Sequence, residues 1–433
     1  MGRPNTTFRR LREDEWEKSR TEAAEYLVAE GLEHGLTVYL VARTIANWEN
    51  GKTGWPQARY RRLLHAVTGR TAKDLGFTPP ALRVRRAAEP ASSDPQGGED
   101  DMHRRDLLLG AGAFALSTVA PGSGPARPAI GLPHLYAITT AEQELYAQDR
   151  DHGSADLGRQ AATALHTAHT WLAEGRYGEE LGRQLHTATG MLSVAAGWLA
   201  LDARRTADAR SLYTEALASA RQADDLGLEA HAFACLSLLA HATGRPREAV
   251  TNARVAQRAA AQLGSPRWLS LLAMREARGW ALQQDSARTE QALVRAYTLY
   301  AQGPSDADPA WLDFYVPGEL AGLESLCRAD LGQHQRAVAG AEHAVMLFSD
   351  GHPRNRALYT ADIALHHARS PRPDLDAVTE AGRRALAHLP DVRSQRLVRS
   401  LNDIADALRA HRTVPCVADY LDRDHAAVLP PAA

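Results

Sequence analysis

The stretch LVARTIANWENG, residues 40–51, decides how the amino-terminal part of the chain folds. Its apolar residues recur at the spacing of one helix face: Val41, Ile45 and Trp48. Gly51 follows at the place where a helix commonly ends. We therefore expect a short helix that buries this face in a small core.

The opposite face of the same helix carries polar side chains that suit contacts with nucleic acid. Arg43, Thr44 and Asn47 can all donate hydrogen bonds to base edges or phosphates. Trp48 lies at helical spacing from Ile45, which is more typical of a core residue than of a DNA contact. We expect Glu49, next to Trp48, to make a structural hydrogen bond.

The residues before this stretch predict two further helices. Residues 3–11 would form the first, with Phe8 and Leu11 facing inward. Ser19 and Glu22 form a capping box, in which the hydroxyl and the carboxylate each satisfy an amide of the first turn. The second helix would start there and pack through small or apolar side chains: Ala23, Ala24 and Leu27. Residues 31–39 would connect it to the helix after Val41.

A basic helix is predicted after the stretch. Pro56 suits the first turn of a helix. Three arginines follow as candidate phosphate contacts: Arg59, Arg61 and Arg62. Apolar residues would complete the small core: Leu63, Leu64, Val67, Leu75 and Phe77. The prolines at 79 and 80 would end the domain, which we assign to residues 1–80.

Residues 42–51, 55–62 and 74–77 resemble the recognition helix and following helices of actinobacterial XRE-type helix-turn-helix transcriptional regulators. The resemblance covers about the first eighty residues. It implies double-stranded DNA as a partner, with Arg43 and Asn47 as base readers and Thr44 nearby. Such readers commonly pair on two half-sites, so a homodimer is expected.

Charge is distributed unevenly along the chain. Residues 1–86 carry a net charge of +6, and the remaining residues carry −8. This asymmetry favours a protein that docks its basic end on nucleic acid. The three cysteines are far apart and in no metal-binding spacing, so we expect neither disulfides nor a metal site and place the protein in the reducing cytoplasm.

Two linkers and an apolar segment are predicted between the two halves. Residues 81–101 and 121–133 are rich in proline, glycine, serine or charge. The segment 102–120 pairs Arg104 and Arg105 with an apolar run of about fourteen residues, whereas a membrane span needs roughly 20. We interpret it as a helix buried on the carboxy-terminal domain or on a second subunit. Export through the paired arginines is the alternative.

From residue 134 to 433 the pattern is helical and repetitive. Alanines recur at steps of 40, 43, 45 and 40 residues: Ala209, Ala249, Ala292, Ala337 and Ala377. Three of them have a second alanine seven residues later: Ala216, Ala256 and Ala344. Gly244 and Gly332 each stand five residues before their alanine, as in tetratricopeptide (TPR) repeats. We predict a TPR-like superhelix of helical hairpins, with an alanine-rich bundle as the alternative.

The sequence offers little catalytic chemistry. It has no glycine-rich phosphate loop and no nucleophile elbow, so no catalytic residues, cofactor or enzyme activity are expected. His166 and His169, and likewise His366 and His367, lack a nearby third ligand. We interpret both pairs as solvated helix positions.

The sequence thus predicts an all-α protein: a helix-turn-helix bundle followed by a TPR-like superhelix. The expected function is transcription regulation, with the superhelix sensing a ligand or recruiting a partner. In layout it is similar to Gram-positive peptide-responsive regulators, which hold peptides with asparagines that are scarce here. Peptide, small-molecule or protein ligands stay open, and four candidates line the first helices of their hairpins: His231, His241, Arg275 and Arg278. The alternative function is an interaction scaffold with a degenerate helix-turn-helix, favoured by the apolar Val41 and Ala46.

Overall fold

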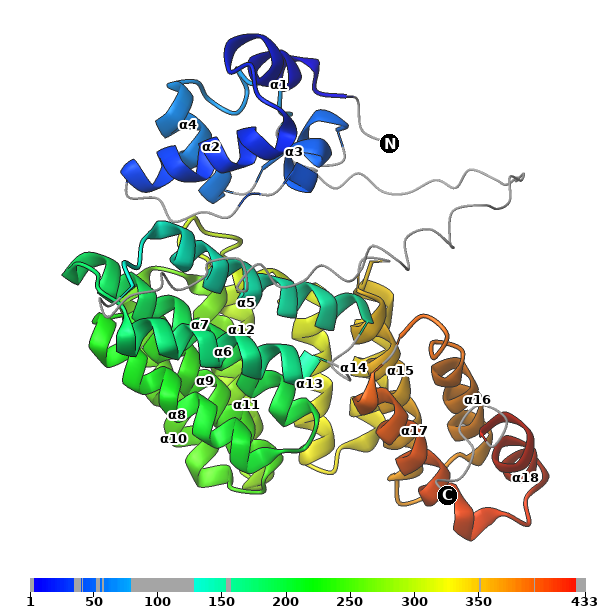
Figure 1. Cartoon of the computed structure of the whole chain (residues 1–433). Helices are drawn as coiled ribbons and strands as arrows, with labels where there is room; N and C mark the ends of the chain where they lie inside the picture. The colour runs from blue at the N-terminus through cyan, green and yellow to red at the C-terminus, as the bar shows by residue number, and fades with distance from the viewer. Residues whose placement is uncertain are drawn as a thin grey trace. The chain divides into compact units, whose positions relative to one another are not determined.

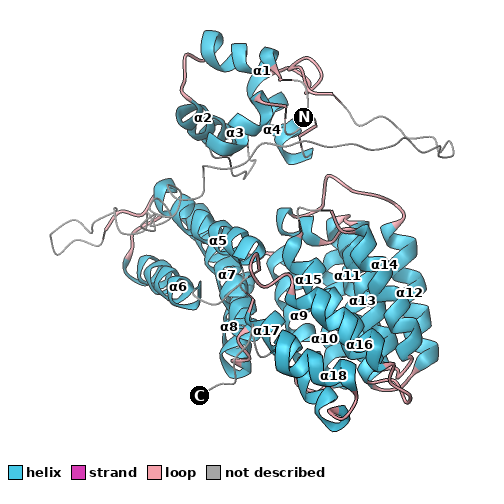
Figure 2. Cartoon of the chain, turned by 90° about the vertical axis from the view of Figure 1, so that its right-hand side faces the viewer, coloured by secondary structure: helices cyan, strands magenta, loops and turns pink. Residues whose placement is uncertain are grey.

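The computed structural model describes residues 4–34, 40, 42–51, 55–56, 58–78, 128–152, 157–349, 352–392 and 394–425 (Figure 1). Within these ranges the regular structure is helical, apart from one isolated bridge between Ala129 and Arg176 (Figure 2). The all-α prediction is confirmed. The chain divides into two compact units, Met1–Ala113 and Phe114–Ala433.

The first unit is a small helical bundle. Its helices are α1 (Thr6–Arg10), α2 (Arg20–Glu33), α3 (Ala42–Glu49) and α4 (Ala58–Thr68), with a π-helical turn at Leu11–Glu15. Helix α2 packs against α3 and α4, and α1 packs against α3. The predicted connection over residues 31–39 is wrong at its start, because α2 continues to Glu33.

Aromatic rings fill the core of this unit. Phe8 lies with its ring centroid 5.3 Å from that of Trp48 and 5.6 Å from that of Phe77. The side chains around them are fully buried: Leu27, Ile45, Leu63, Leu64 and Leu75. The predicted core is confirmed except at Val67, which is only half-buried, and at Val41, which lies outside the described residues.

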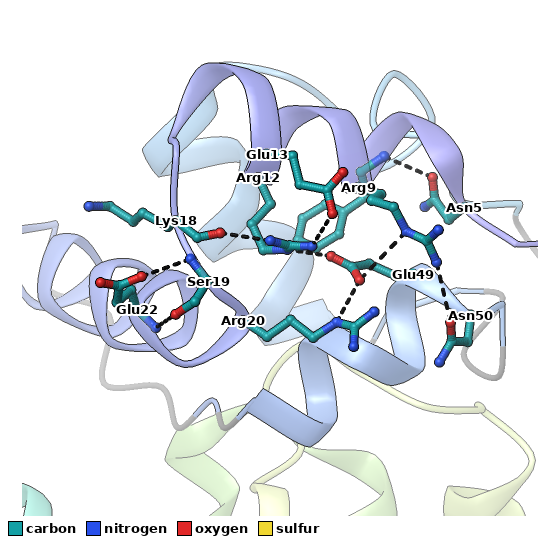
Figure 3. A network of polar contacts seen from close by, with 11 residues as sticks. Asn5, Arg9, Arg12, Glu13, Lys18, Ser19, Arg20, Glu22, Glu49 and Asn50 are labelled. Carbon is teal, nitrogen blue, oxygen red and sulfur yellow. Dashed lines mark hydrogen bonds and ion pairs between the residues drawn. The ribbon is translucent and has the colours of Figure 1, made fainter.

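Local capping fixes where the first helices begin. The amide of Phe8 donates a hydrogen bond of 3.0 Å to the side chain of Asn5, which caps α1. At α2 the Ser19 amide donates to Glu22 at 2.8 Å, and the Glu22 amide donates to the Ser19 hydroxyl at 3.3 Å (Figure 3). The predicted capping box is confirmed.

The second unit is an array of helical hairpins. Two helices, α5 (Leu132–His152) and α6 (Leu157–Glu174), precede it. The hairpins are then, in order, α7 (Glu179–Asp202) with α8 (Thr206–Ala223), α9 (Leu226–Ala242) with α10 (Pro246–Ala260), α11 (Pro266–Leu282) with α12 (Ser286–Tyr300), α13 (Pro317–Asp330) with α14 (His334–Leu347), and α15 (Pro353–Ala368) with α16 (Leu375–Leu386). Helices α17 (Gln395–Leu408) and α18 (Pro415–Asp419) complete the unit.

The repeat is carried by the second helix of each hairpin. Its fourth residue is always buried: Ala209, Ala249, Thr289, Ala337 and Val378. Seven residues later stands an alanine that is 0% exposed: Ala216, Ala256, Ala296, Ala344 and Ala385. Small residues at these places let the two helices of a hairpin approach closely. Our placement of Ala292 and Ala377 in this register is wrong, because Thr289 and Val378 take those positions.

Left-handed residues make four of the five turns between the two helices of a hairpin. Gly244 and Gly332 have φ angles of 66° and 72°, a region that glycine enters without a steric penalty. Arg204 and Gln284 occupy the corresponding turns with a φ of 59° each. Non-glycine residues at these two turns explain why the glycine signal marks only part of the array.

The predicted linker over residues 121–133 is wrong from residue 128 onward, and residues 121–127 lie outside the described residues. The Ile130 amide donates to the Arg176 carbonyl at 3.1 Å, and the Arg176 amide donates to Pro128 at 2.9 Å. Ile130 is 5% exposed, and α5 begins at Leu132. The linker 81–101 and the apolar segment 102–120 lie outside the described residues. None of the described helices is long and apolar enough to cross a membrane.

The first helices of the hairpins form a row that turns back on itself. Helices α7, α9, α11, α13 and α15 each contact the next. Helix α5 contacts α7 at one end of this row and α15 at the other. Charged side chains of α5, α9, α11, α13, α15 and α17 therefore come close together, and we call the side of the row that carries them the inner face.

Candidate functional site

A buried carboxylate fixes helix α3 within the first unit. Glu49 is 0% exposed and accepts hydrogen bonds from Arg12 Nε at 2.5 Å and from Arg20 Nε at 2.8 Å (Figure 3). Arg9 Nε lies 3.8 Å from the same carboxylate. One side chain at the end of α3 thus joins α1, the π-helical turn and α2. The structural role expected for Glu49 is confirmed.

The charge of Glu49 depends on these arginines. Burial would raise the pKa of Glu49, but hydrogen bonds from Arg12 and Arg20 outweigh burial and lower the pKa below its usual value. A carboxylate at a helix carboxy terminus also meets the negative end of the helix dipole. The sequence analysis did not identify Arg12 and Arg20 as the partners of Glu49. A glutamate at the carboxy end of a helix does indicate that cations lie nearby, because it would otherwise be unfavourable there.

This arrangement leaves one face of α3 to the surface. Ile45 and Trp48 are buried, whereas Thr44 and Asn47 are half-buried. Arg43 belongs to α3, but its side chain lies outside the described residues. Two of the three predicted base contacts are therefore partly exposed on α3.

The arginines predicted as phosphate contacts fall into different environments. Arg61 Nη1 donates to the Pro56 carbonyl at 2.7 Å, and its guanidinium lies 5.3 Å from the centroid of the Trp55 ring. Arg61 therefore supports the turn before α4. Arg62 is exposed at the surface of α4. The side chain of Arg59 lies outside the described residues.

The four candidate ligand residues lie on the first helices of two adjacent hairpins. His231 and His241 belong to α9, and Arg275 and Arg278 belong to α11. His241 Nε2 lies 2.9 Å from Asp330 Oδ2, and Arg278 Nε lies 3.4 Å from the same oxygen. Asp330 ends α13, so this charged group links three first helices.

Arg275 has no comparable partner. Its Nε atom is buried and has no hydrogen-bond acceptor among the residues that the structure describes. Burial lowers the pKa of Arg275, which shows that neighbouring charges do not fully compensate for its lost hydration. Those neighbours include Cys235 on α9 and Glu319 on α13.

His231 lies near Arg275 and is rigidly held. Its ring stacks on Trp311 with a centroid distance of 3.8 Å and an interplanar angle of 10°. Burial, followed by the nearby Arg275, lowers the pKa of His231 to about 3, so the ring is neutral. Its Nδ1 atom is buried without a hydrogen-bond partner.

Acidic residues of α13 and α15 face the same region. Asn355 donates a hydrogen bond of 2.8 Å to Glu319. Burial raises the pKa of Glu319 despite nearby Arg275 and Arg396. Burial also raises the pKa of Asp362, which makes no hydrogen bond or ion pair within the described part of the chain. Sequence reasoning missed both carboxylates because acidic residues are spread evenly along these helices.

The two histidine pairs noted in the sequence, one on α6 and one on α15, lie in different environments. His166 is exposed, and His169 pairs with Glu215, whose hydrogen bond raises the pKa of His169. The prediction that His366 is solvated is wrong, because its side chain is 2% exposed and burial lowers its pKa to about 4. Among the described residues no group of three or more metal-ligating side chains is placed to hold a metal ion. All three cysteines are unpaired.

No protein family matches the sequence, and no curated protein matches it. Among solved structures, the chain is similar to the crystal structure of a Rap protein complexed with competence and sporulation factor. The two are 12% identical, with a TM-score of 0.42, over 66% of this chain and 90% of that chain.

Proposed function

We propose that the protein is a DNA-binding transcription regulator and not an enzyme, and that its helical array senses a ligand or recruits a partner. The observation that carries the DNA-binding part is the fixing of α3 by Glu49. A short helix held at its carboxy end by Arg12 and Arg20 presents its polar face in a defined orientation. A defined helix face is what base reading in the major groove needs.

Residues of α3 would contact base edges, and residues of α4 would contact the phosphate backbone of the DNA. Asn47 can pair with the edge of adenine, Arg43 with the edge of guanine, and Thr44 can contact either. Arg62, which is exposed, would contact phosphates together with Arg59. Arg61 would act mainly by supporting the turn at Pro56.

A gel-shift titration of the full chain across a salt series tests this proposal. Asn47→Ala should weaken binding at the preferred site alone, whereas Arg62→Gln should weaken binding to all sequences and reduce the salt slope by about 1. Arg258→Gln, at an exposed position on α10 in the other unit, is the matched control and should change neither quantity.

A scaffold with a helix-turn-helix that no longer reads DNA is the second candidate. It is favoured by Ala46, which is half-buried on α3 and offers no hydrogen bond at a position where related regulators carry a polar contact. The same titration separates the two, because a scaffold would show equal affinity for every duplex at each salt concentration.

Regulators of this kind gain affinity by pairing, so we further propose a homodimer in the cytoplasm. Two copies would place two α3 helices on half-sites about one DNA turn apart. One chain has a mass of 47.1 kDa, and light scattering of the full chain should report twice that mass. A mass of one chain, bound to a site without two-fold symmetry, would contradict the dimer.

A further inference from the structure

Two arginines of α11, Arg275 and Arg278, lie one helical turn apart on the inner face of the array. Side chains three residues apart on a helix have Cβ atoms about 5–6 Å from each other. Arg278 directs its Nε atom to Asp330 at 3.4 Å. Arg275 makes no hydrogen bond or ion pair among the residues that the structure describes, and its Nε atom is buried. The side chain as a whole is half-buried, so a small ligand can still reach its guanidinium group.

The groups around Arg275 do not replace its lost hydration. Burial acts most strongly and lowers its pKa, and Cys235, Arg278 and Glu319 follow in that order. Cys235 carries no charge near neutral pH, because burial raises the pKa of its thiol to about 12. The charged neighbour that acts most strongly on Arg275 is therefore another cation, Arg278, ahead of the carboxylate of Glu319. Two guanidinium groups that repel each other away from bulk water are unfavourable unless an anion lies between them.

Two further polar groups close to Arg275 are unused. The Tyr213 hydroxyl and the His231 Nδ1 atom are buried, and neither atom makes a hydrogen bond within the described part of the chain. Arg275 acts electrostatically on both side chains, which places them near its guanidinium group. Tyr213 is 0% exposed, and His231 is 6% exposed and fixed by stacking on Trp311. A hydroxyl and a neutral imidazole can both donate hydrogen bonds, so the surroundings of Arg275 suit a ligand rich in acceptors.

We propose that the inner face binds the phosphate group of a small phosphorylated molecule between Arg275 and Arg278. A phosphate monoester has three terminal oxygens and close to two negative charges at neutral pH. A carboxylate has two oxygens and one charge, which a single guanidinium group can satisfy. Two guanidinium groups and the Tyr213 hydroxyl therefore match a phosphate better than a carboxylate. The inference rests on the proposed sensing role of the array and names the ligand class.

Isothermal titration calorimetry of the full chain at constant ionic strength tests this chemistry with four defined probes. Inorganic phosphate is the bare group, and glycerol phosphate and adenosine monophosphate are two monoesters. Dimethyl phosphate is a diester with a single charge, like the phosphates of the DNA backbone. At least one of the first three probes should bind once per chain with a dissociation constant below about 1 mM, and the tightest of them identifies the source of the phosphate. The diester should bind about tenfold more weakly or not at all.

Variants connect the binding to the named residues. Arg275→Met should weaken binding by about tenfold or more, and Tyr213→Phe, which removes only the unused hydroxyl, should weaken it severalfold. Arg258→Met, at an exposed position on α10, is the matched control and should leave binding unchanged. Without a probe, Arg275→Met should unfold at the same or a higher temperature, because it removes the repulsion from Arg278. If Arg275→Met does not fold, Arg275→Lys replaces it: the charge stays, the planar fork is lost, and binding should still weaken.

Three results would overturn the proposal: no binding of inorganic phosphate or either monoester up to about 10 mM, equal affinities for monoester and diester, or undiminished binding by the Arg275 variant. A pool of tripeptides with free ends, titrated in the same way, should not bind. Binding of that pool in place of the phosphates would also contradict the proposal, because it would assign the inner face to a peptide. A protein that binds a monoester but no DNA would remove the proposed regulatory function while leaving the phosphate site intact.

Discussion

Arg354 and Asp149 are 205 residues apart in the sequence, yet Arg354 Nη1 donates a hydrogen bond of 3.1 Å to the carboxylate of Asp149. Arg354 Nη2 also lies 3.0 Å from Asp202, and Trp198 Nε1 donates to Asp149 at 2.9 Å. Arg399 of α17 donates to the Asp202 carbonyl. These contacts, which we call the clasp, join α5 and α7 at one end of the array to α15 and α17 at the other.

The clasp should hold the two ends of the array together. Arg354, Asp149 and Asp202 are each at most 6% exposed, so Arg354→Met leaves two buried carboxylates without their main cation. Breaking such a pair costs about 3–5 kcal/mol. Hydrogen exchange measured by mass spectrometry should therefore become faster in α5 and α15.

Two further variants control this prediction. Arg369→Met, at an exposed position after α15, should leave the exchange unchanged. Adding Asp149→Asn and Asp202→Asn to Arg354→Met should restore most of the protection, because no uncompensated charge remains. Unchanged exchange in the Arg354→Met variant would show that apolar packing alone closes the array.

The stability of α3 should depend on pH through Glu49. Its pKa is lowered in the folded state, so its contribution is present above the unfolded value of about 4.3 and is lost as pH falls through the folded value. Glu49→Gln should cost about 3 kcal/mol at neutral pH, since it leaves the buried Arg12 without its anion.

Hydrogen exchange of the α3 amides, compared between wild type and Glu49→Gln, measures this contribution. The difference between the two proteins should be large at pH 7 and should shrink below about pH 4. A difference that stays constant across this range would mean that the lost hydrogen-bond geometry, and not the carboxylate charge, is responsible.

Close packing between α7 and α8 should make Gly197 sensitive to substitution. A Cβ atom added at Gly197 of α7 would lie 2.4 Å from Tyr213 of α8, whose side chain is fully buried. Gly197→Ala should therefore lower stability by about 1–3 kcal/mol in urea unfolding. Gly131→Ala, whose nearest contact would be Pro133 at 3.6 Å, should have little effect. Tyr213→Leu should relieve most of the loss if the contact is the cause.

Local patterns were enough to predict much of the fold. The apolar face of α3, the capping box at Ser19 and the paired alanines of the hairpins depend on residues only a few positions apart. The same reasoning failed where a different residue fills an equivalent place. Thr289 and Val378 replace the alanines, and Gln284 replaces the glycine of a turn.

The candidate sites could be predicted only in part, because their partners are distant in sequence. Arg275 and Arg278 were expected on the first helix of a hairpin, and they lie there. Asp330, from the next hairpin, pairs with Arg278 through the packing of neighbouring hairpins, which no local pattern encodes. The burial of His366 was missed for the same reason: its neighbours come from tertiary packing.

The central claim is that α3 reads DNA, and binding-site selection from a random duplex pool tests it most directly. The full chain, selected at physiological salt, should enrich one sequence motif. Asn47→Ala should lose about 1–3 kcal/mol of discrimination at a single position of that motif and keep the rest. Enrichment of no motif by the wild type, or of an identical motif by Asn47→Ala, would contradict the account.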